Sequence, residues 1–172
     1  AKPAWDQAQT AGLSLYVPLH AAGVWGFDPY VMRSVATTGM SLCMNTLAKD
    51  FDLEKAGAGI REVKALRSCY LGDYYPLLGI NVDERHWCGW QFDRPETGEG
   101  FAVFFRRVQS AYTGVSAQLR GLDPQASYEV TLFESYAPKE KKTMRGEELS
   151  KLQVGIEAAP GSMLITYKKT VK

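Results

Sequence analysis

The spacing of apolar residues changes once along the chain, and this change constrains the fold more than any other feature of the sequence. Between residues 28 and 70, apolar residues recur every three or four positions, as on one face of a helix. From about Leu71 onward they alternate with polar residues, as in a strand that has one buried face. The sequence therefore predicts helices first and a sheet after them.

One strand and a first helix are expected in the first half. The apolar run Leu13–Val17 is closed by Pro18, which has no N–H for a strand ladder, and this pattern predicts a short strand. Asp28 followed by Pro29 is typical of a helix start. Apolar positions continue at helical spacing as far as Cys43, so we expect this helix to reach that residue.

A second helix is expected after Asp52, a capping residue, and should continue to about Tyr70. Its predicted inward face consists of Leu53, Ala56, Ile60, Val63 and Leu66.

The second half contains six segments with strand-like alternation, separated by turn residues. They cover residues 85–92, 100–107, 115–120, 127–134, 152–157 and 162–168. The charged cluster Lys139–Lys142 lies between two of them and is expected at a solvated loop tip. Six short strands at regular spacing predict an antiparallel β-sandwich, so the expected fold class is α+β.

Composition excludes several classes of function. The chain has 172 residues with 20 basic and 19 acidic side chains, so it lacks the one-signed field that binding to nucleic acid or to an anionic membrane requires. No apolar run approaches the length of about 18 residues that a transmembrane helix needs. Three cysteines without a CxxC pair argue against a disulfide scaffold and favour a reducing compartment such as the cytoplasm.

Four sequence blocks, taken in order, carry a resemblance to a known family. They are GLSLYVPLHAAG at 12–23, LGDYYPL at 71–77, WQFDRP with GEG at 90–100, and LRGLDP at 119–124. The chain thereby resembles the carboxy-terminal part of the α-galactosidase-like (melibiase-like) glycoside hydrolases of clan D. The resemblance implies that residues 1–78 are the terminal strand and helices of an incomplete (β/α)8 barrel, and that residues 79–172 are a carboxy-terminal antiparallel β-sandwich.

The resemblance also implies where the chemistry belongs. Retaining glycosidases use two carboxylates, a nucleophile and an acid/base, about 5 Å apart at the ends of different barrel strands. In the resembling enzymes both lie upstream of the segment that begins at Ala1, and Asp6 lacks the surrounding acid/base pattern. We therefore expect no catalytic residue in this chain, no cofactor, no activity of the chain alone, and a carbohydrate substrate for the intact enzyme.

His20 and Trp25 are the candidate substrate-binding residues. Both lie near the loop after the predicted terminal strand, and barrel enzymes build their sites from such loops. An indole face suits the apolar face of a sugar ring, and an imidazole can hydrogen-bond a hydroxyl. The alternative is that Trp25 packs within the loop and that His20 is a structural polar group.

Other patterns leave alternatives open. His86 and Cys88 share one strand face, but tetrahedral zinc needs two more ligands, so we expect no metal site. The aromatic cluster of Tyr74, Tyr75, Trp87, Trp90 and Phe92 is either a sugar-binding platform or, preferably, the contact between barrel and sandwich. The competing functional hypothesis is a non-catalytic carbohydrate-binding or structural β-sandwich module. The apolar face of an incomplete barrel would need covering by packing onto the sandwich in a non-barrel way, by self-association, or by the missing barrel portion of a longer chain.

Overall fold

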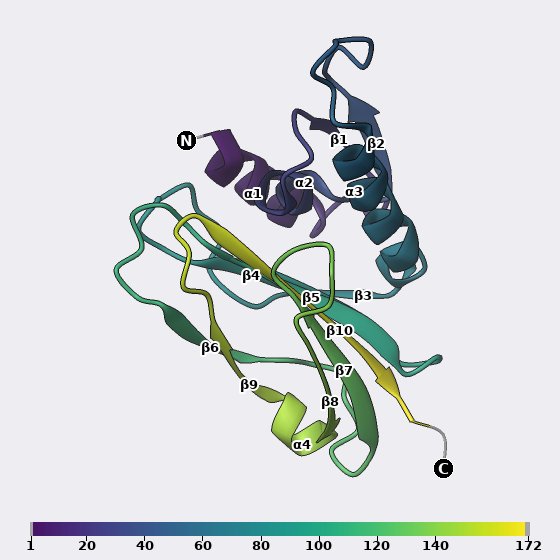
Figure 1. Cartoon of the computed structure of the whole chain (residues 1–172). Coiled ribbons are helices and arrows are strands. Elements are labelled where there is room, and N and C mark those ends of the chain that lie inside the picture. The colour runs from purple at the N-terminus through teal and green to yellow at the C-terminus, as the bar shows by residue number, and fades with distance from the viewer. Residues whose placement is uncertain (1, 171–172) are drawn as a thin grey trace.

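The computed structural model describes residues 2–170, which form three layers (Figure 1). The first layer holds the helices and two short strands: α1 (Lys2–Leu13), β1 (Ala21–Val24), α2 (Pro29–Val35), β2 (Gly39–Leu42), α3 (Leu53–Leu66) and the 3-10 turn η1 (Cys69–Leu71). The second is a six-stranded antiparallel sheet in the order β3 (Asp73–Pro76), β4 (Cys88–Arg94), β5 (Glu99–Arg106), β10 (Gly161–Lys169), β7 (Ser127–Phe133) and β8 (Glu140–Arg145). The third pairs β6 (Gly114–Gln118) with β9 (Lys151–Gly155), beside the short α4 (Gly146–Leu149).

The middle strands of the large sheet are buried on both faces. In β5, Phe101, Val103 and Phe105 belong to the core on the helical side. The alternate residues Ala102 and Phe104 belong to the core beneath β6 and β9. A strand covered on both faces reads as a continuous apolar run, and this explains the sequence of β5. The antiparallel sandwich predicted for the second half is confirmed.

Arg33 of α2 fixes the helical layer to the sheet. Its guanidinium donates to both carboxylate oxygens of Glu62 on α3, at 2.8 and 2.7 Å. It also donates to the main-chain oxygens of Phe133 and Ser135 and to the hydroxyl of Ser162. The side chain is only 3% exposed, so every donor that leaves water finds a protein acceptor, as burial of a charge requires.

A second buried arginine, Arg107, also joins the helical layer to the sheet. Arg107 donates to the side chains of Gln7 on α1 and Asn81 in the β3–β4 loop, at 2.9 and 3.0 Å. The hydroxyls of Tyr74 and Tyr136 donate to main-chain oxygens of α1 and of the β1–α2 loop. The helices are therefore attached to the sheet by polar contacts as well as by the apolar core.

The strand predicted over Leu13–Val17 is wrong. Leu13 ends α1, and the amides of Tyr16 and Val17 both donate to its carbonyl oxygen, at 2.9 and 2.7 Å, in a helix-terminating turn. An apolar run of five residues does not separate a strand from a helix end by its pattern alone. The first strand of the chain is β1, eight residues after Leu13.

The first predicted helix is correct at its start and too long at its end. Asp28 caps α2 by accepting from the amide of Tyr30, as expected. The helix ends at Val35, and Gly39–Leu42 form β2, which pairs parallel with β1. The hydroxyl of Thr37 donates to the carbonyl oxygen of His20 and so draws the chain into this pairing.

The second predicted helix is confirmed at its start as α3, with Asp52 accepting from the amide of Lys55, but it ends at Leu66, before the expected end near Tyr70. Four members of its predicted inward face are buried or packed against the core, whereas Leu53 is 77% exposed. All six predicted strands exist, and β3 and β8 add to them. The cluster Lys139–Lys142 enters β8, so the expectation of a loop tip is wrong: it lies on an edge strand, where lysines discourage pairing with other chains.

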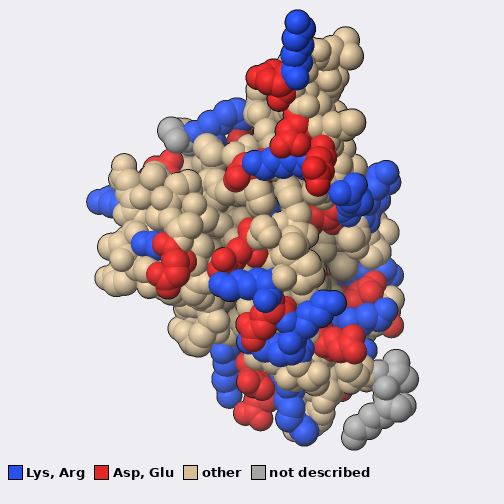
Figure 2. All heavy atoms as spheres, in the orientation of Figure 1, with Lys and Arg blue, Asp and Glu red and all other residues tan. Residues whose placement is uncertain are grey.

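β3 lies before residue 79, yet it pairs with β4 in the large sheet, so this sheet contains strands from both sides of the predicted domain boundary. The boundary between residues 78 and 79 stays a prediction. The view in Figure 2 has basic and acidic side chains mixed over the face that carries α3, β7, β8 and β10. Among residues 2–170, no helix has the length and apolar character that crossing a bilayer requires.

Candidate functional site

The carboxyl ends of β1 and β2 lie at one edge of their parallel pair, because the strands run in the same direction. Trp25 follows the end of β1, and Cys43 follows the end of β2. A β-carbon on Gly23 would lie 2.9 Å from the sulfur of Cys43 and 3.2 Å from the indole nitrogen of Trp25. The missing side chain of Gly23 thus gives room for Trp25 and Cys43 to approach each other.

The first turns of α1 add two charged groups to this edge. The ammonium of Lys2 lies 5.1 Å from the ring centroid of Trp25, a cation–π contact. The same ammonium donates to both carboxylate oxygens of Asp6, at 2.9 and 2.8 Å. We call Trp25, Gly23, Cys43, Lys2 and Asp6 the strand-end cluster.

The strand-end cluster has groups suited to contact a sugar, but it does not hold the pair of carboxylates that glycoside hydrolysis uses. It contains one carboxylate, Asp6, which is paired with Lys2. The next acid along the chain, Asp28, caps α2. Trp25 is 57% exposed and offers an apolar face beside charged hydrogen-bonding groups, a combination suited to a sugar ring.

His20 lies at the other end of β1. It precedes the first residue of the strand, whereas Trp25 follows the last, so the two Cα atoms are roughly 16 Å apart at the usual rise per residue. Its Nε2 lies 3.1 Å from the hydroxyl of Ser14, and burial lowers its pKa. Its carbonyl oxygen accepts from Thr37, Thr38 and Gly39, the residues that lead into β2.

The structure therefore does not bring the two predicted site residues together. Trp25 lies at the edge where parallel α/β structures place their sites, and His20 lies at the opposite edge. Sequence reasoning missed Lys2, Asp6 and Cys43 as neighbours of Trp25. No local signal could have found them, because their proximity depends on the parallel pairing of β1 with β2 and on the packing of α1.

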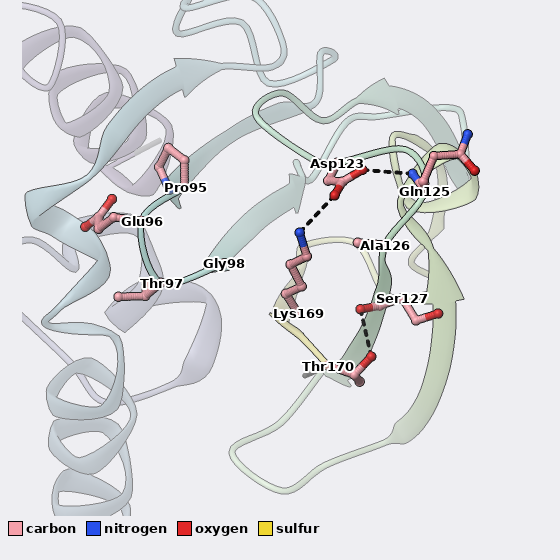
Figure 3. A pocket seen from close by; sticks show the side chains of 10 residues that line it. All are labelled: Pro95, Glu96, Thr97, Gly98, Asp123, Gln125, Ala126, Ser127, Lys169 and Thr170. Carbon is pink, nitrogen blue, oxygen red and sulfur yellow. Dashed lines mark hydrogen bonds and ion pairs between the residues drawn. The ribbon is translucent and has the colours of Figure 1, made fainter. Parts of the chain in front are cut away.

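Several hollows lie outside this cluster, and two of them are large. One, of about 570 Å³, lies between the β4–β5 turn, the loop before β7 and the end of β10 (Figure 3). Its walls mix polar and apolar residues, and the ion pair of Lys169 with Asp123, at 2.8 Å, lies within it. Its lining residues include no aromatic ring. The other, of about 620 Å³, is lined by Trp87 and Tyr112 among others.

No metal centre is formed by the described part of the chain. Among residues 2–170, no group of three His, Cys, Asp or Glu side chains is placed to hold an ion. His86 lies beside Asp83, with Nδ1 3.2 Å from a carboxylate oxygen. Cys88 is buried, and burial raises the pKa of its thiol to about 11. All three cysteines are free thiols.

Comparison with solved structures gives matches to α-galactosidases. GH36 α-galactosidase AgaA from Geobacillus stearothermophilus matches with a TM-score of 0.60 and 18% identity, over 82% of this chain and 19% of that one. The α-galactosidase from Lactobacillus brevis matches with a TM-score of 0.59 and 15% identity, over 78% and 18%. The galactosidase domain of the α-galactosidase–sucrose kinase AgaSK matches with a TM-score of 0.58 and 17% identity, over 82% and 19%.

The chain has the fold of one part of a GH36 α-galactosidase. It spans about a fifth of the length of those enzymes. No protein-family model matches the sequence, and no curated protein matches it.

Two of the family-like blocks meet in this α-galactosidase-type fold through a buried polar network. The amide of Gln91, in WQFDRP, accepts from the main-chain N–H of Arg120 and donates to its carbonyl oxygen, both at 2.8 Å, and so fixes the LRGLDP loop. The hydroxyl of Tyr167 donates to Asp93 at 2.6 Å. Gly121 has a φ of 75° and lies against the Asp93 carboxylate, where a β-carbon would find no room. These blocks therefore have a structural reason for their residues, separate from catalysis.

Proposed function

We propose that this chain is the carboxy-terminal portion of a retaining glycoside hydrolase acting on α-galactoside-like carbohydrates. In this role it supplies the closing strands and helices of the catalytic barrel and a β-sandwich that supports them. The nucleophile and the acid/base belong to polypeptide upstream of Ala1, so the chain has no turnover alone. The fold shared with solved α-galactosidases supports the proposal.

The single observation that carries the barrel assignment is the parallel pair β1–β2. Parallel strands occur almost only in sheets with several strands and both faces covered. Here the pair forms a sheet of two, so within residues 2–170 each strand has one edge without a strand partner. The order α1–β1–α2–β2–α3 is the alternation of a (β/α) barrel.

Exposed apolar side chains around this pair support the same role. Large apolar side chains in the first half that lie in solvent are Trp5, Leu15, Tyr16, Val17, Leu19, Trp25, Leu42, Leu47 and Leu53. Apolar side chains gathered on one part of a molecule mark a contact surface. In the proposal, the missing barrel portion covers part of this surface; self-association of the isolated chain is the competing way to cover it.

The strand-end cluster is proposed as the contribution of this chain to the substrate pocket. Its edge of the β1–β2 pair is the edge at which barrel enzymes bind substrate. Trp25 would lie at the rim of the pocket and stack on a sugar ring. We propose that His20, at the opposite edge, stabilises the turn between α1 and β1 instead of touching the sugar.

The test has two arms. The 172-residue chain, assayed with a chromogenic α-galactoside, should give no hydrolysis, and any turnover that copurifies with the folded chain would contradict the upstream location of both carboxylates. The chain expressed with the polypeptide encoded upstream of Ala1 should hydrolyse the same compound with retention of anomeric configuration. Absence of activity there would remove the hydrolase assignment.

In that longer polypeptide, Trp25→Ala should lower kcat/KM by roughly tenfold, because a lost stacking contact is worth up to about 1.5 kcal/mol. Val108, which is 51% exposed and lies in the sandwich half, offers a control, and Val108→Ala should leave kcat/KM unchanged. Equal kinetics for wild type and Trp25→Ala would exclude Trp25 from the substrate site.

A further inference from the structure

A hollow of about 620 Å³ opens at the end of the sandwich where β4 begins and β5 ends. The β3–β4 loop and the β5–β6 loop form most of it. The two loops are joined by a hydrogen bond of 3.1 Å from the main-chain N–H of Gln109 to the main-chain carbonyl oxygen of Glu84. The volume lies in the range of small-molecule sites, about 300 to 1,000 Å³. The hollow shares no lining residue with the strand-end cluster.

Tyr112 gives this hollow an exposed aromatic face. Its side chain is 76% exposed, although a tyrosine ring gains free energy from burial. Its main chain is fixed from below, because the indole nitrogen of the buried Trp87 donates to its carbonyl oxygen at 3.1 Å, and the hydroxyl of Ser110 donates at 3.3 Å. The ring is thus carried on an ordered support, as a stacking platform requires.

Asp83 organises the polar groups of the rim. It accepts from the main-chain amide and Nε of Arg85, both at 3.0 Å, and from its Nη2 at 2.7 Å. The Asp83 carboxylate also lies 3.2 Å from Nδ1 of His86. Hydrogen bonds from Arg85 lower the pKa of Asp83, so this carboxylate stays ionised and offsets the guanidinium charge. Nη1 of Arg85 and Nε2 of His86 are the atoms left to bond a ligand.

The chemistry of the hollow matches an uncharged ligand with many hydroxyl groups. An aromatic face binds the apolar side of a sugar ring. The guanidinium of Arg85, the imidazole of His86 and the side-chain amide of Gln109 can form hydrogen bonds with hydroxyl groups. The ion pair of Asp83 with Arg85 leaves little net positive charge for an anion such as a phosphate.

We propose that this hollow binds a neutral oligosaccharide, with Tyr112 as the stacking platform and Arg85, His86 and Gln109 as hydroxyl partners. The site is non-catalytic and separate from the substrate pocket proposed around Trp25. It does not depend on the hydrolase role, because it lies wholly in the sandwich.

The direct test is titration of the full chain with three neutral trisaccharides, raffinose, maltotriose and cellotriose. Binding is followed by calorimetry and by the indole N–H resonances, which single Trp→Phe variants assign. We expect at least one trisaccharide to bind saturably and to shift the resonance of Trp87, whose N–H lies beneath Tyr112, while that of Trp25 stays in place.

Variants of the exposed tyrosine sharpen the test. Tyr112→Ala should weaken binding about tenfold, as for other aromatic anchors, and Tyr112→Phe should retain most of the affinity because the ring remains. Tyr16 is similarly exposed, at 83%, and lies outside the hollow, so Tyr16→Ala should bind like wild type. Inorganic phosphate, the anion probe, should not bind through Arg85.

Four results would overturn the proposal. These are no saturable binding of any of the three trisaccharides, unchanged affinity in Tyr112→Ala, phosphate binding tighter than that of every sugar, and a resonance shift confined to Trp25. The last result would assign sugar binding to the strand-end cluster and leave the hollow without a ligand.

Discussion

At the scale of single residues, Asp93 lies in surroundings that disfavour its charge. The residue is 2% exposed, one carboxylate oxygen accepts from Tyr167, and the other has no partner among the described residues. Burial raises the pKa of this carboxyl above its ordinary value of 3.8. The folded state therefore binds the proton more tightly than the unfolded state does.

This shift predicts a pH dependence of stability. The stabilisation from protonated Asp93 is fully present below the unfolded pKa and is lost as pH rises through the folded pKa. Urea unfolding of wild type and Asp93→Asn, whose side chain does not titrate, should therefore give a stability difference that moves in favour of the variant as the pH rises above the unfolded pKa of about 4. A trend of opposite sign for Asp93→Asn would contradict the raised pKa.

At the scale of elements, attachment of the helices to the sheet depends on few side chains. Arg33 contacts α3, the end of β7 and the start of β10 at once. Glu62, its ionic partner, is 10% exposed. Breaking a buried ion pair by removing one partner leaves an uncompensated charge, and this costs more than the pair itself contributes.

Arg33→Met should lower the free energy of unfolding by about 3 to 5 kcal/mol, because Glu62 then stays buried and unpaired. The double variant Arg33→Met/Glu62→Gln should recover part of this loss, since the stranded charge is gone. Arg61, exposed on α3, serves as the control, and Arg61→Met should change stability by less than about 0.5 kcal/mol. Equal stability of the Arg33 and Arg61 variants in urea would disprove the structural role of Arg33.

At the scale of the whole molecule, the large sheet is shared by two cores. One core lies between the sheet and the helices, and the other lies between the sheet and the β6–β9 pair. β5 contributes side chains to both, so neither core can open without exposing that strand. Trp90 and Phe92 lie in the helix-side core, where the aromatic cluster was expected to join the two halves.

The two halves should therefore unfold in one cooperative transition. In the variant Trp5→Phe/Trp25→Phe, the remaining Trp87, just before β4, and Trp90, within β4, are both buried and report on the sheet by fluorescence, while far-ultraviolet circular dichroism reports on the helices. The two signals should have the same midpoint in urea, as in a two-state transition. Two separate midpoints would mean that the helical half is an independent unit.

The sequence alone determined the features that neighbouring residues fix: the Asp28 and Asp52 caps, the start of α2, the course of α3 and six strands of the sandwich. Capping side chains and the period of apolar residues act within a few positions, so they can be read locally. For the candidate site, sequence reasoning predicted Trp25 and the class of loop that carries it.

Only the tertiary structure decided the rest. β1 and β2 pair with each other across the intervening helix α2, and β8 is a charged edge strand paired with β7, so the period of apolar residues marks none of the three as a strand. The packing of α1 places Lys2 beside Trp25, and the position of β1 between His20 and Trp25 puts these two residues at its opposite ends. Such contacts arise from packing between segments, and no stretch of neighbouring residues carries that information.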